Sequence, residues 1–168
     1  KSTLGRALAG KLRRRFVDLD EEVAMLLGVA TAGDAIRQFG LEEFRAAETR
    51  ALTRLLEVRA RRRPFVLALG GGTPTAPGAA ELLRGVRAQD RAQVLYLRAN
   101  VATLKARLKA EIGAGAADRP SITGADPVKE VNELFKARDP LYRELADNEI
   151  DAEQTPGRVT QAMLRAVR

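Results

Sequence analysis

The stretch that most constrains the fold is an unbroken apolar run, F-V-L-A-L, over residues 65–69. A strand with one face in water alternates apolar and polar side chains, so a run without alternation predicts a strand covered on both faces. Such strands are typical of a parallel sheet flanked by helices. Gly70, Gly71 and Gly72 follow the run directly. One glycine would serve a plain turn, whereas three favour a close approach between the backbone and a ligand.

The rest of the chain alternates between predicted strands and helices. Further strands are expected at residues 16–20, 94–97 and 149–151, and helices after Thr3, over 21–27, 34–39 and 41–61, and after Pro77, Asn100, Asp126 and Pro156. We expect Asp20 to cap the helix over 21–27, Pro77 to lie in a first helical turn, and Asp139-Pro140 to interrupt a helix. The pattern predicts an α/β fold, a three-layer α/β/α sandwich around a central parallel sheet, in a single domain over residues 1–168.

The first three residues, Lys1, Ser2 and Thr3, precede apolar residues at helical spacing. They match the end of the phosphate-binding pattern G-x-x-x-x-G-K-[ST], in which the Lys reaches the β- and γ-phosphates and the hydroxyl ligates Mg²⁺. An ordinary helix start with a Ser or Thr cap is the alternative. The glycines of the pattern do not appear in this sequence. We expect them, with a first strand, to precede Lys1 in the natural protein.

The composition excludes several kinds of site. The chain has no Cys and no His, which excludes disulfides, thiolate metal sites and imidazole chemistry. No apolar run reaches transmembrane length, so no membrane partner is expected and cytoplasm is the default location. The net charge is +7, but only 4% of residues are aromatic and the densest basic clusters lie at predicted helix ends. We therefore expect no nucleic-acid partner.

Ligands of parallel α/β sheets collect at the carboxyl ends of the strands. Lys1, Asp18, Asp20 and the three glycines would lie along that edge. Residues 113–124 are rich in Gly and Ala and have few apolar anchors, which predicts a mobile flap.

Six blocks of sequence, taken together and in order, resemble the shikimate kinases. They are K-S-T-L-G-R-A-L-A, F-V-D-L-D, F-R-A-A-E, L-A-L-G-G-G, D-R-P and R-D-P-L-Y. The resemblance covers essentially the whole chain. It implies a P-loop kinase that uses ATP with Mg²⁺ to phosphorylate the 3-hydroxyl of shikimate, a step of aromatic amino-acid biosynthesis. It also implies a monomer, with substrate-binding helices over residues 20–61 and a lid over residues 112–125.

The resemblance assigns roles to individual residues on the nucleotide side. Lys1, Ser2 and Thr3 would hold the phosphates, Ser2 and Asp18 the Mg²⁺, and Gln154 and Thr155 would lie near the adenine. Arg119 would swing from the lid onto the phosphates, with Lys1 and Asp20 as its catalytic partners. The alternatives are a solvated loop Arg at position 119 and a solvated strand end at Asp18.

On the substrate side, Asp20 would accept a hydrogen bond from the reacting hydroxyl and orient it. Arg45 and Arg138 would grip the substrate carboxylate, and Gly71 and Gly72 would let the backbone approach the ring. The alternatives are a surface ion pair between Arg45 and Glu48 and a helix-dipole partner at Arg138.

Two other functions remain open from the sequence. One is another small P-loop kinase, such as a gluconate or nucleoside kinase. The other is a non-catalytic ligand sensor of the kind fused to DNA-binding modules. The presence of Asp20, both arginines and Arg119 favours catalysis.

Overall fold

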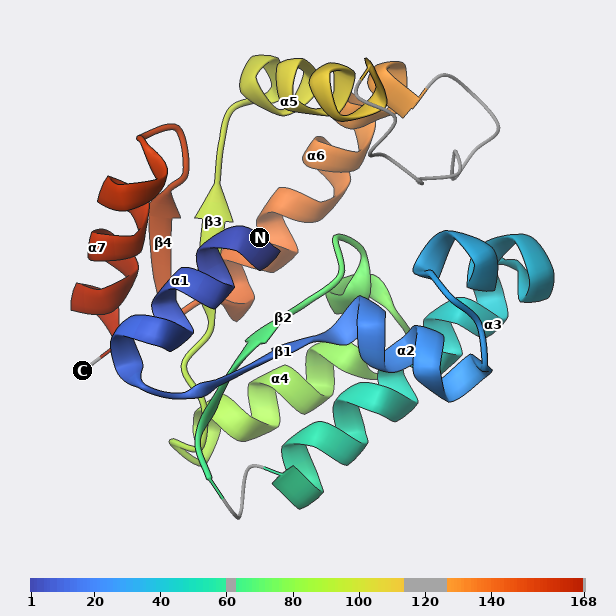
Figure 1. Ribbon diagram of the computed structural model, residues 1–168, viewed down its shortest axis with the longest axis horizontal. Coiled ribbons are helices and arrows are strands. Elements are labelled where there is room, and N and C mark those ends of the chain that lie inside the picture. The colour runs from blue at the N-terminus through green and yellow to red at the C-terminus, as the bar shows by residue number, and fades with distance from the viewer. Residues whose placement is uncertain (60–62, 114–126, 168) are drawn as a thin grey trace.

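The computed structural model describes residues 1–59, 63–113 and 127–167. Helices and strands alternate along the chain, as predicted (Figure 1). In chain order they are α1 (Ser2–Leu12), β1 (Arg15–Asp18), α2 (Leu19–Leu27), α3 (Ala32–Arg54), a π-helical turn (Leu55–Arg59), β2 (Phe65–Ala68), a 3₁₀ turn (Thr73–Thr75), α4 (Ala79–Ala88), β3 (Leu95–Arg98), α5 (Val101–Gly113), α6 (Pro127–Leu145), β4 (Asn148–Asp151) and α7 (Pro156–Ala166). No helix in this part of the chain is both long and apolar enough to cross a membrane.

The described strands form two parallel pairs. β1 pairs with β2, with Asp18 opposite Ala68, and β3 pairs with β4, with Arg98 opposite Asp151. Apolar residues of β2 and β3 line a cavity of about 790 Å³, together with Leu8 and Leu12 of α1. The expected parallel pairing is confirmed. The further strand expected ahead of Lys1 stays a prediction.

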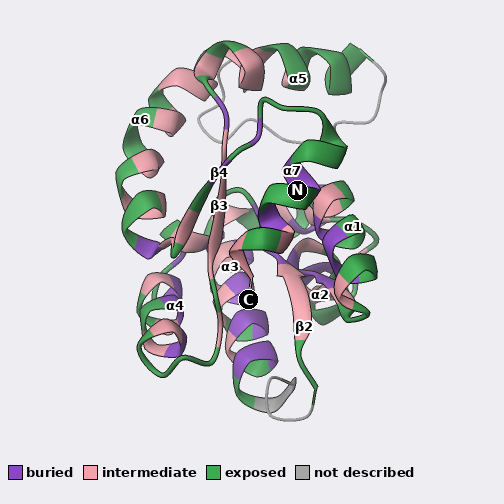
Figure 2. Ribbon diagram, turned by 90° about the vertical axis from the view of Figure 1, so that its left-hand side faces the viewer, coloured by how far each residue is buried: buried purple, intermediate pink, exposed green. Residues whose placement is uncertain are grey.

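Helices cover the strand pairs on two sides, and each side has its own apolar core (Figure 2). Val66, Leu95 and Leu97 pack towards α1 and α7, around buried Leu8 and Met163. Phe65 and Leu67, on the opposite face of β2, pack with the larger core formed by α2, α3 and α4. The predicted strand at residues 65–69 is thus covered on both faces. The lack of alternation between apolar and polar side chains indicated this. This is the expected three-layer arrangement.

The turn from β1 into α2 differs from the prediction. Asp18, not Asp20, is the N-cap of α2, and its carboxylate accepts a hydrogen bond from the Asp20 N–H at 3.2 Å. The helix therefore begins at Leu19, two residues earlier than expected, and Asp20 lies in its first turn. The cap leaves the Asp20 side chain available for contacts outside the helix. The expected stop at Gly28, with φ +71°, is confirmed.

Two helices also differ from the prediction in their bounds. α4 begins at Ala79 with Gly78 as its N-cap, so Pro77 lies before the helix and not in its first turn. α6 runs continuously from Pro127 to Leu145 through Pro140, where an interruption was expected. The two helices predicted over residues 34–39 and 41–61 are joined in α3, with a kink at Gly40, which has φ +82°.

Candidate active site

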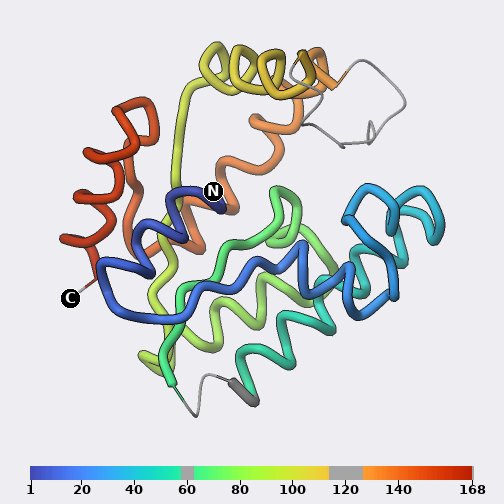
Figure 3. The backbone as a smooth tube through the Cα atoms, viewed as in Figure 1, coloured from blue at the N-terminus to red at the C-terminus, as the bar shows by residue number. Residues whose placement is uncertain are grey.

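The turn after β2, Gly70 to Gly72, is here called the glycine bend. It lies at the carboxyl edge of the β1–β2 pair, because the last residue of β1, Asp18, is opposite Ala68, which ends β2. The N-terminus of α1 lies on the same side of the molecule (Figure 3). A Cβ built on Gly71 would lie 3.9 Å from Nζ of Lys1. The ammonium group of Lys1 therefore lies beside the glycine bend.

The N-terminus of α1 places Ser2 against the end of β1. Lys1 is the N-cap and makes no side-chain capping bond, and the Ser2 hydroxyl donates to Oδ2 of Asp18 at 2.5 Å. The helix start is therefore not the simple Ser cap that was the alternative. Thr3 is exposed in the first turn. Amides of a helix N-terminus and a Lys side chain suit an anionic ligand.

Asp20 approaches the backbone of Gly70, and so does Glu48 from α3. A Cβ built on Gly70 would lie 2.6 Å from Oδ1 of Asp20, 2.7 Å from Oε1 of Glu48 and 2.9 Å from the Thr73 hydroxyl. Any larger residue would push these oxygens away, so the position requires glycine for space. Glu48 is fully buried, and its carboxylate accepts a hydrogen bond from the Thr73 hydroxyl at 2.5 Å.

Arg45 lies over Gly72, held by Glu48. Its NH1 donates to Oε2 of Glu48, and its side chain is only 16% exposed. A Cβ on Gly72 would overlap the guanidinium group. The pair with Glu48 is real, but it is not the surface ion pair that was the alternative. The buried carboxylate of Glu48 therefore holds the Arg45 guanidinium against Gly72 of the glycine bend.

Arg138 reaches the same bend from α6. Its NH1 donates to the Gly71 carbonyl at 3.1 Å, and the Tyr142 hydroxyl donates to the same oxygen at 2.7 Å. Burial raises the pKa of Tyr142, and the positive charges of Arg138 and Arg45 oppose that shift. The charges of both arginines therefore reach the Tyr142 hydroxyl, although the two residues come from different helices.

The structure thus brings together Lys1, Ser2, Asp18, Asp20, Arg45, Arg138 and the glycine bend. One end of this group has an ammonium and a helix N-terminus suited to phosphate, and the other has two guanidinium groups suited to a carboxylate. The carboxylate of Asp20 lies at the same bend, beside Gly70. A small anionic alcohol could bind here next to a phosphate donor.

A metal ion has a partial donor set at this site. The hydroxyl of Ser2 and the carboxylate of Asp18 touch, and both are hard oxygen ligands of the kind Mg²⁺ prefers. No group of three or more acidic residues that could hold a metal occurs among the described residues. Since Mg²⁺ is usually bound through one or two protein groups and the substrate phosphates, this small set fits it.

Two predicted site residues lie away from the glycine bend. Gln154 and Thr155 are at the turn between β4 and α7, where the Gln154 amide donates to Asp151 at 3.1 Å and Thr155 is the N-cap of α7 without a side-chain bond. Arg119 and residues 114–125 of the predicted lid lie outside the described residues. Residues 112–113 of that range form the end of α5, a helix without a buried residue.

Three further residues of the site, Glu48, Thr73 and Tyr142, had no predicted role in it. The spacing of three residues between Arg45 and Glu48 did indicate their pairing. No local signal showed that Glu48 would be buried against Thr73, 25 residues away, or that Tyr142 would reach Gly71. These contacts depend on how α3 and α6 pack around the bend.

Comparisons with known proteins agree on one family. The family model described as Shikimate kinase matches residues 1–168. The chain is 38% identical to a shikimate kinase of Bordetella pertussis, over 93% of this chain and 67% of the relative, and 37% identical to shikimate kinase 2 of an Enterobacter species, over 100% and 89%. The solved structure of an Acinetobacter baumannii shikimate kinase in complex with shikimate is similar, with a TM-score of 0.80 and 32% identity over 98% of this chain and 84% of the other.

Proposed function

The chain belongs to the shikimate kinase family, and we propose that it transfers the γ-phosphoryl group of ATP to the 3-hydroxyl of shikimate at the glycine bend. The observation that carries the proposal is the convergence of Arg45 and Arg138 on the bend that Asp20 and Lys1 also approach. The similar A. baumannii protein is described in complex with shikimate, which supports this substrate.

The two arginines hold the carboxylate of shikimate. A guanidinium group can grip a carboxylate through two parallel hydrogen bonds, which fixes the orientation of the ring as well as its charge. Gly72 leaves room for the Arg45 guanidinium against the backbone, since a Cβ there would overlap it, and Gly71 lets the ring approach the backbone beside Lys1. A gluconate or nucleoside kinase is disfavoured by the family membership, and so is a non-catalytic sensor.

Lys1, Ser2 and Thr3 hold the phosphates of ATP at the N-terminus of α1, with Gln154 and Thr155 on the adenine side and Arg119 as a further phosphate ligand. Ser2 and Asp18 hold Mg²⁺, which offsets the negative charge of the phosphates when it is bound. The donor set of touching hydroxyl and carboxylate oxygens supports this assignment.

Asp20 orients the 3-hydroxyl and accepts its proton. The hydroxyl oxygen bonds to the γ-phosphorus while the bond from that phosphorus to the β-γ bridging oxygen breaks, and ADP leaves. Phosphoryl transfer relies on positioning and on charge stabilisation, which Lys1 and the helix N-terminus supply. The single domain over residues 1–168, the cytoplasmic location and the monomeric state stay predictions.

A coupled assay of ADP release tests the function. The full-length natural protein is assayed with ATP and Mg²⁺, with and without shikimate. We expect ADP release to depend on shikimate and to stop when EDTA removes the divalent ion. Gluconate and a nucleoside serve as competing acceptors. Turnover with either of these but not with shikimate would reassign the acceptor, and no acceptor-dependent turnover would favour the sensor.

A Gly72→Ala variant should bind shikimate poorly while remaining folded. Gly72 has φ −118°, which alanine adopts without strain, so the backbone is not disturbed; the new Cβ displaces the Arg45 guanidinium, which also weakens its pair with buried Glu48. We expect the KM for shikimate to rise about tenfold or more, because the loss of one well-placed charged hydrogen bond is worth about 1.5–3 kcal/mol. Gly85→Ala in α4, where a Cβ meets nothing within 4 Å, is the matched control. Equal KM values for the two variants would argue against Arg45 as a ligand of the shikimate carboxylate.

A further inference from the structure

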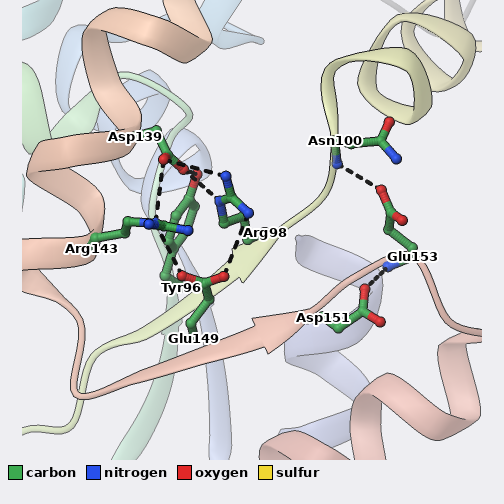
Figure 4. Close-up of polar contacts among 8 residues, drawn as sticks. All are labelled: Tyr96, Arg98, Asn100, Asp139, Arg143, Glu149, Asp151 and Glu153. Atoms are coloured by element: carbon green, nitrogen blue, oxygen red, sulfur yellow. Dashed lines mark hydrogen bonds and ion pairs between the residues drawn. The ribbon is translucent and has the colours of Figure 1, made fainter.

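The carboxylate of Asp139 joins α6 to the strand pair β3–β4. It belongs to a group that we call the Asp139 network, formed by Tyr96, Arg98, Asp139, Arg143 and Glu149 (Figure 4). Oδ1 of Asp139 accepts hydrogen bonds from the Tyr96 hydroxyl at 2.9 Å and from Nε of Arg98 at 2.7 Å. Nε of Arg143, one turn further along α6, lies 3.3 Å from Oδ2. The side chain is only 14% exposed, so these contacts replace most of its water.

The network acts where α6 is weakest. Pro140 has no N–H, so the helix lacks the bond to the Lys136 carbonyl, and proline also disfavours a helical conformation at the residue before it. That residue is Asp139. The helix nevertheless continues through Pro140 to Leu145. Contacts outside the helix must stabilise this turn, and the Asp139 network supplies them from β3.

The same turn of α6 carries the residues that contact the glycine bend. Arg138 precedes Asp139, and Tyr142 follows one turn later, and both donate to the Gly71 carbonyl. Tyr96 connects the two groups, because its hydroxyl binds Asp139 and its ring packs edge-on against Tyr142, with centroids 5.5 Å apart and an interplanar angle of 86°. Asp139 and Arg138 are neighbours on one helix, so anchoring Asp139 restricts the rotation of α6 and with it the direction in which Arg138 leaves the helix.

Electrostatics favour an ionised carboxylate here. Burial by itself raises the pKa of Asp139, but the hydrogen bonds from Arg98 and Tyr96 outweigh it and hold the pKa below its ordinary value. Burial and the bond to Asp139 raise the pKa of Tyr96, so the phenol keeps its proton and remains a donor. The bonds to Arg98 and Tyr96 are therefore intact near neutral pH.

We propose that Asp139 is a positioning residue, which binds Tyr96 and Arg98 and thereby sets the rotation of α6 that directs Arg138 and Tyr142 at the glycine bend. Its effect on catalysis rests on the proposed function, since it acts on shikimate only through Arg138. Asp139 itself is not proposed to contact the substrate.

Steady-state kinetics of Asp139→Asn test the effect on the substrate. Asparagine keeps the size but loses the charge, and we expect the KM for shikimate to rise about fivefold to tenfold, with kcat and the KM for ATP within about twofold. In an Arg138→Lys background the same change should add less than about twofold, because both act through one side chain. Glu144→Gln is the control on the same helix, where Glu144 forms an exposed pair with Arg84 at 2.7 Å. A KM like that of the control, or full additivity with Arg138→Lys, overturns the proposal.

Hydrogen exchange of the ligand-free protein separates this proposal from the function. We expect faster amide exchange around residues 138–142 in Asp139→Asn and no change in Glu144→Gln. If the wild type lacks shikimate-dependent turnover, the proposed function fails, and the exchange data alone decide whether Asp139 holds α6. Unchanged exchange overturns it. Where Asp139→Asn does not fold, Asp139→Ala takes its place. Asp139→Glu keeps the charge and should have a lower KM for shikimate than the Asn or Ala variant. A Glu variant whose KM is no lower indicates a packing role only and also overturns the proposal.

Discussion

We expect an Asp20→Asn variant to lose a factor of about 10² to 10⁴ in kcat, the usual contribution of a positioned general base. The amide keeps the size of the side chain beside Gly70, where Oδ1 lies 2.6 Å from the position of a Cβ, so the local packing is preserved. It cannot take the proton of the substrate hydroxyl. Because binding depends on other residues, the KM values for shikimate and ATP should change by no more than a few fold.

Glu21→Gln is the matched control for this result. Glu21 follows Asp20 in the first turn of α2 and forms an exposed pair with Arg6 at 2.9 Å. Its loss removes one acidic charge from the same helix end without touching the glycine bend. Turnover within about twofold of the wild type is expected for this surface pair. If Asp20→Asn also stays within twofold, Asp20 is not the base, and its approach to Gly70 serves only the fold.

The second large effect is expected from Arg45→Lys, which should raise the KM for shikimate by about 10- to 100-fold. Lysine keeps the positive charge but loses the planar fork that grips a carboxylate through two bonds. The expected factor corresponds to about 1.4–2.8 kcal/mol. The kcat should fall less, since Arg45 holds the acid and does not contact the transferred phosphoryl group.

A thermal melt must accompany the Arg45→Lys kinetics, because Glu48 is fully buried and relies on Arg45. Weakening the partner of a buried charge destabilises a protein. Arg50→Lys on the same helix is the control, since Arg50 forms an exposed pair with Glu43. A lower Tm with an unchanged KM would mean that Arg45 only stabilises buried Glu48. The carboxylate of shikimate would then need another ligand.

Much of the fold followed from local patterns. The unbroken apolar run at residues 65–69 indicated a strand covered on both faces, and β2 has one core on each side. Gly28 and Gly40 marked a helix end and a kink, because both have positive φ values that glycine tolerates. The type and the approximate bounds of a helix or strand depend on backbone preferences and on which residues are buried. Both leave a pattern within a short stretch of sequence.

Capping and interruption were predicted less well. Two acidic residues, Asp18 and Asp20, flank the start of α2, and either side chain could cap it. Asp18 is the cap because β1 ends there against β2. The break expected at Pro140 is absent, and the residue before the proline, Asp139, is bound to β3 at that turn. In both cases a contact between distant segments decided between two local conformations of similar energy.

By itself, the sequence determined which chemical groups the chain carries, the order of its strands and helices, and its resemblance to one family of kinases. Only the tertiary structure decided that Arg138 meets the carbonyl of Gly71, 67 residues away, and that Glu48 is buried beside Thr73. Periodicity and turn residues act over a few positions, so a short stretch is enough to show them. The geometry of the site depends on the packing of α2, α3 and α6 around one glycine bend, and that packing is a property of the whole folded chain.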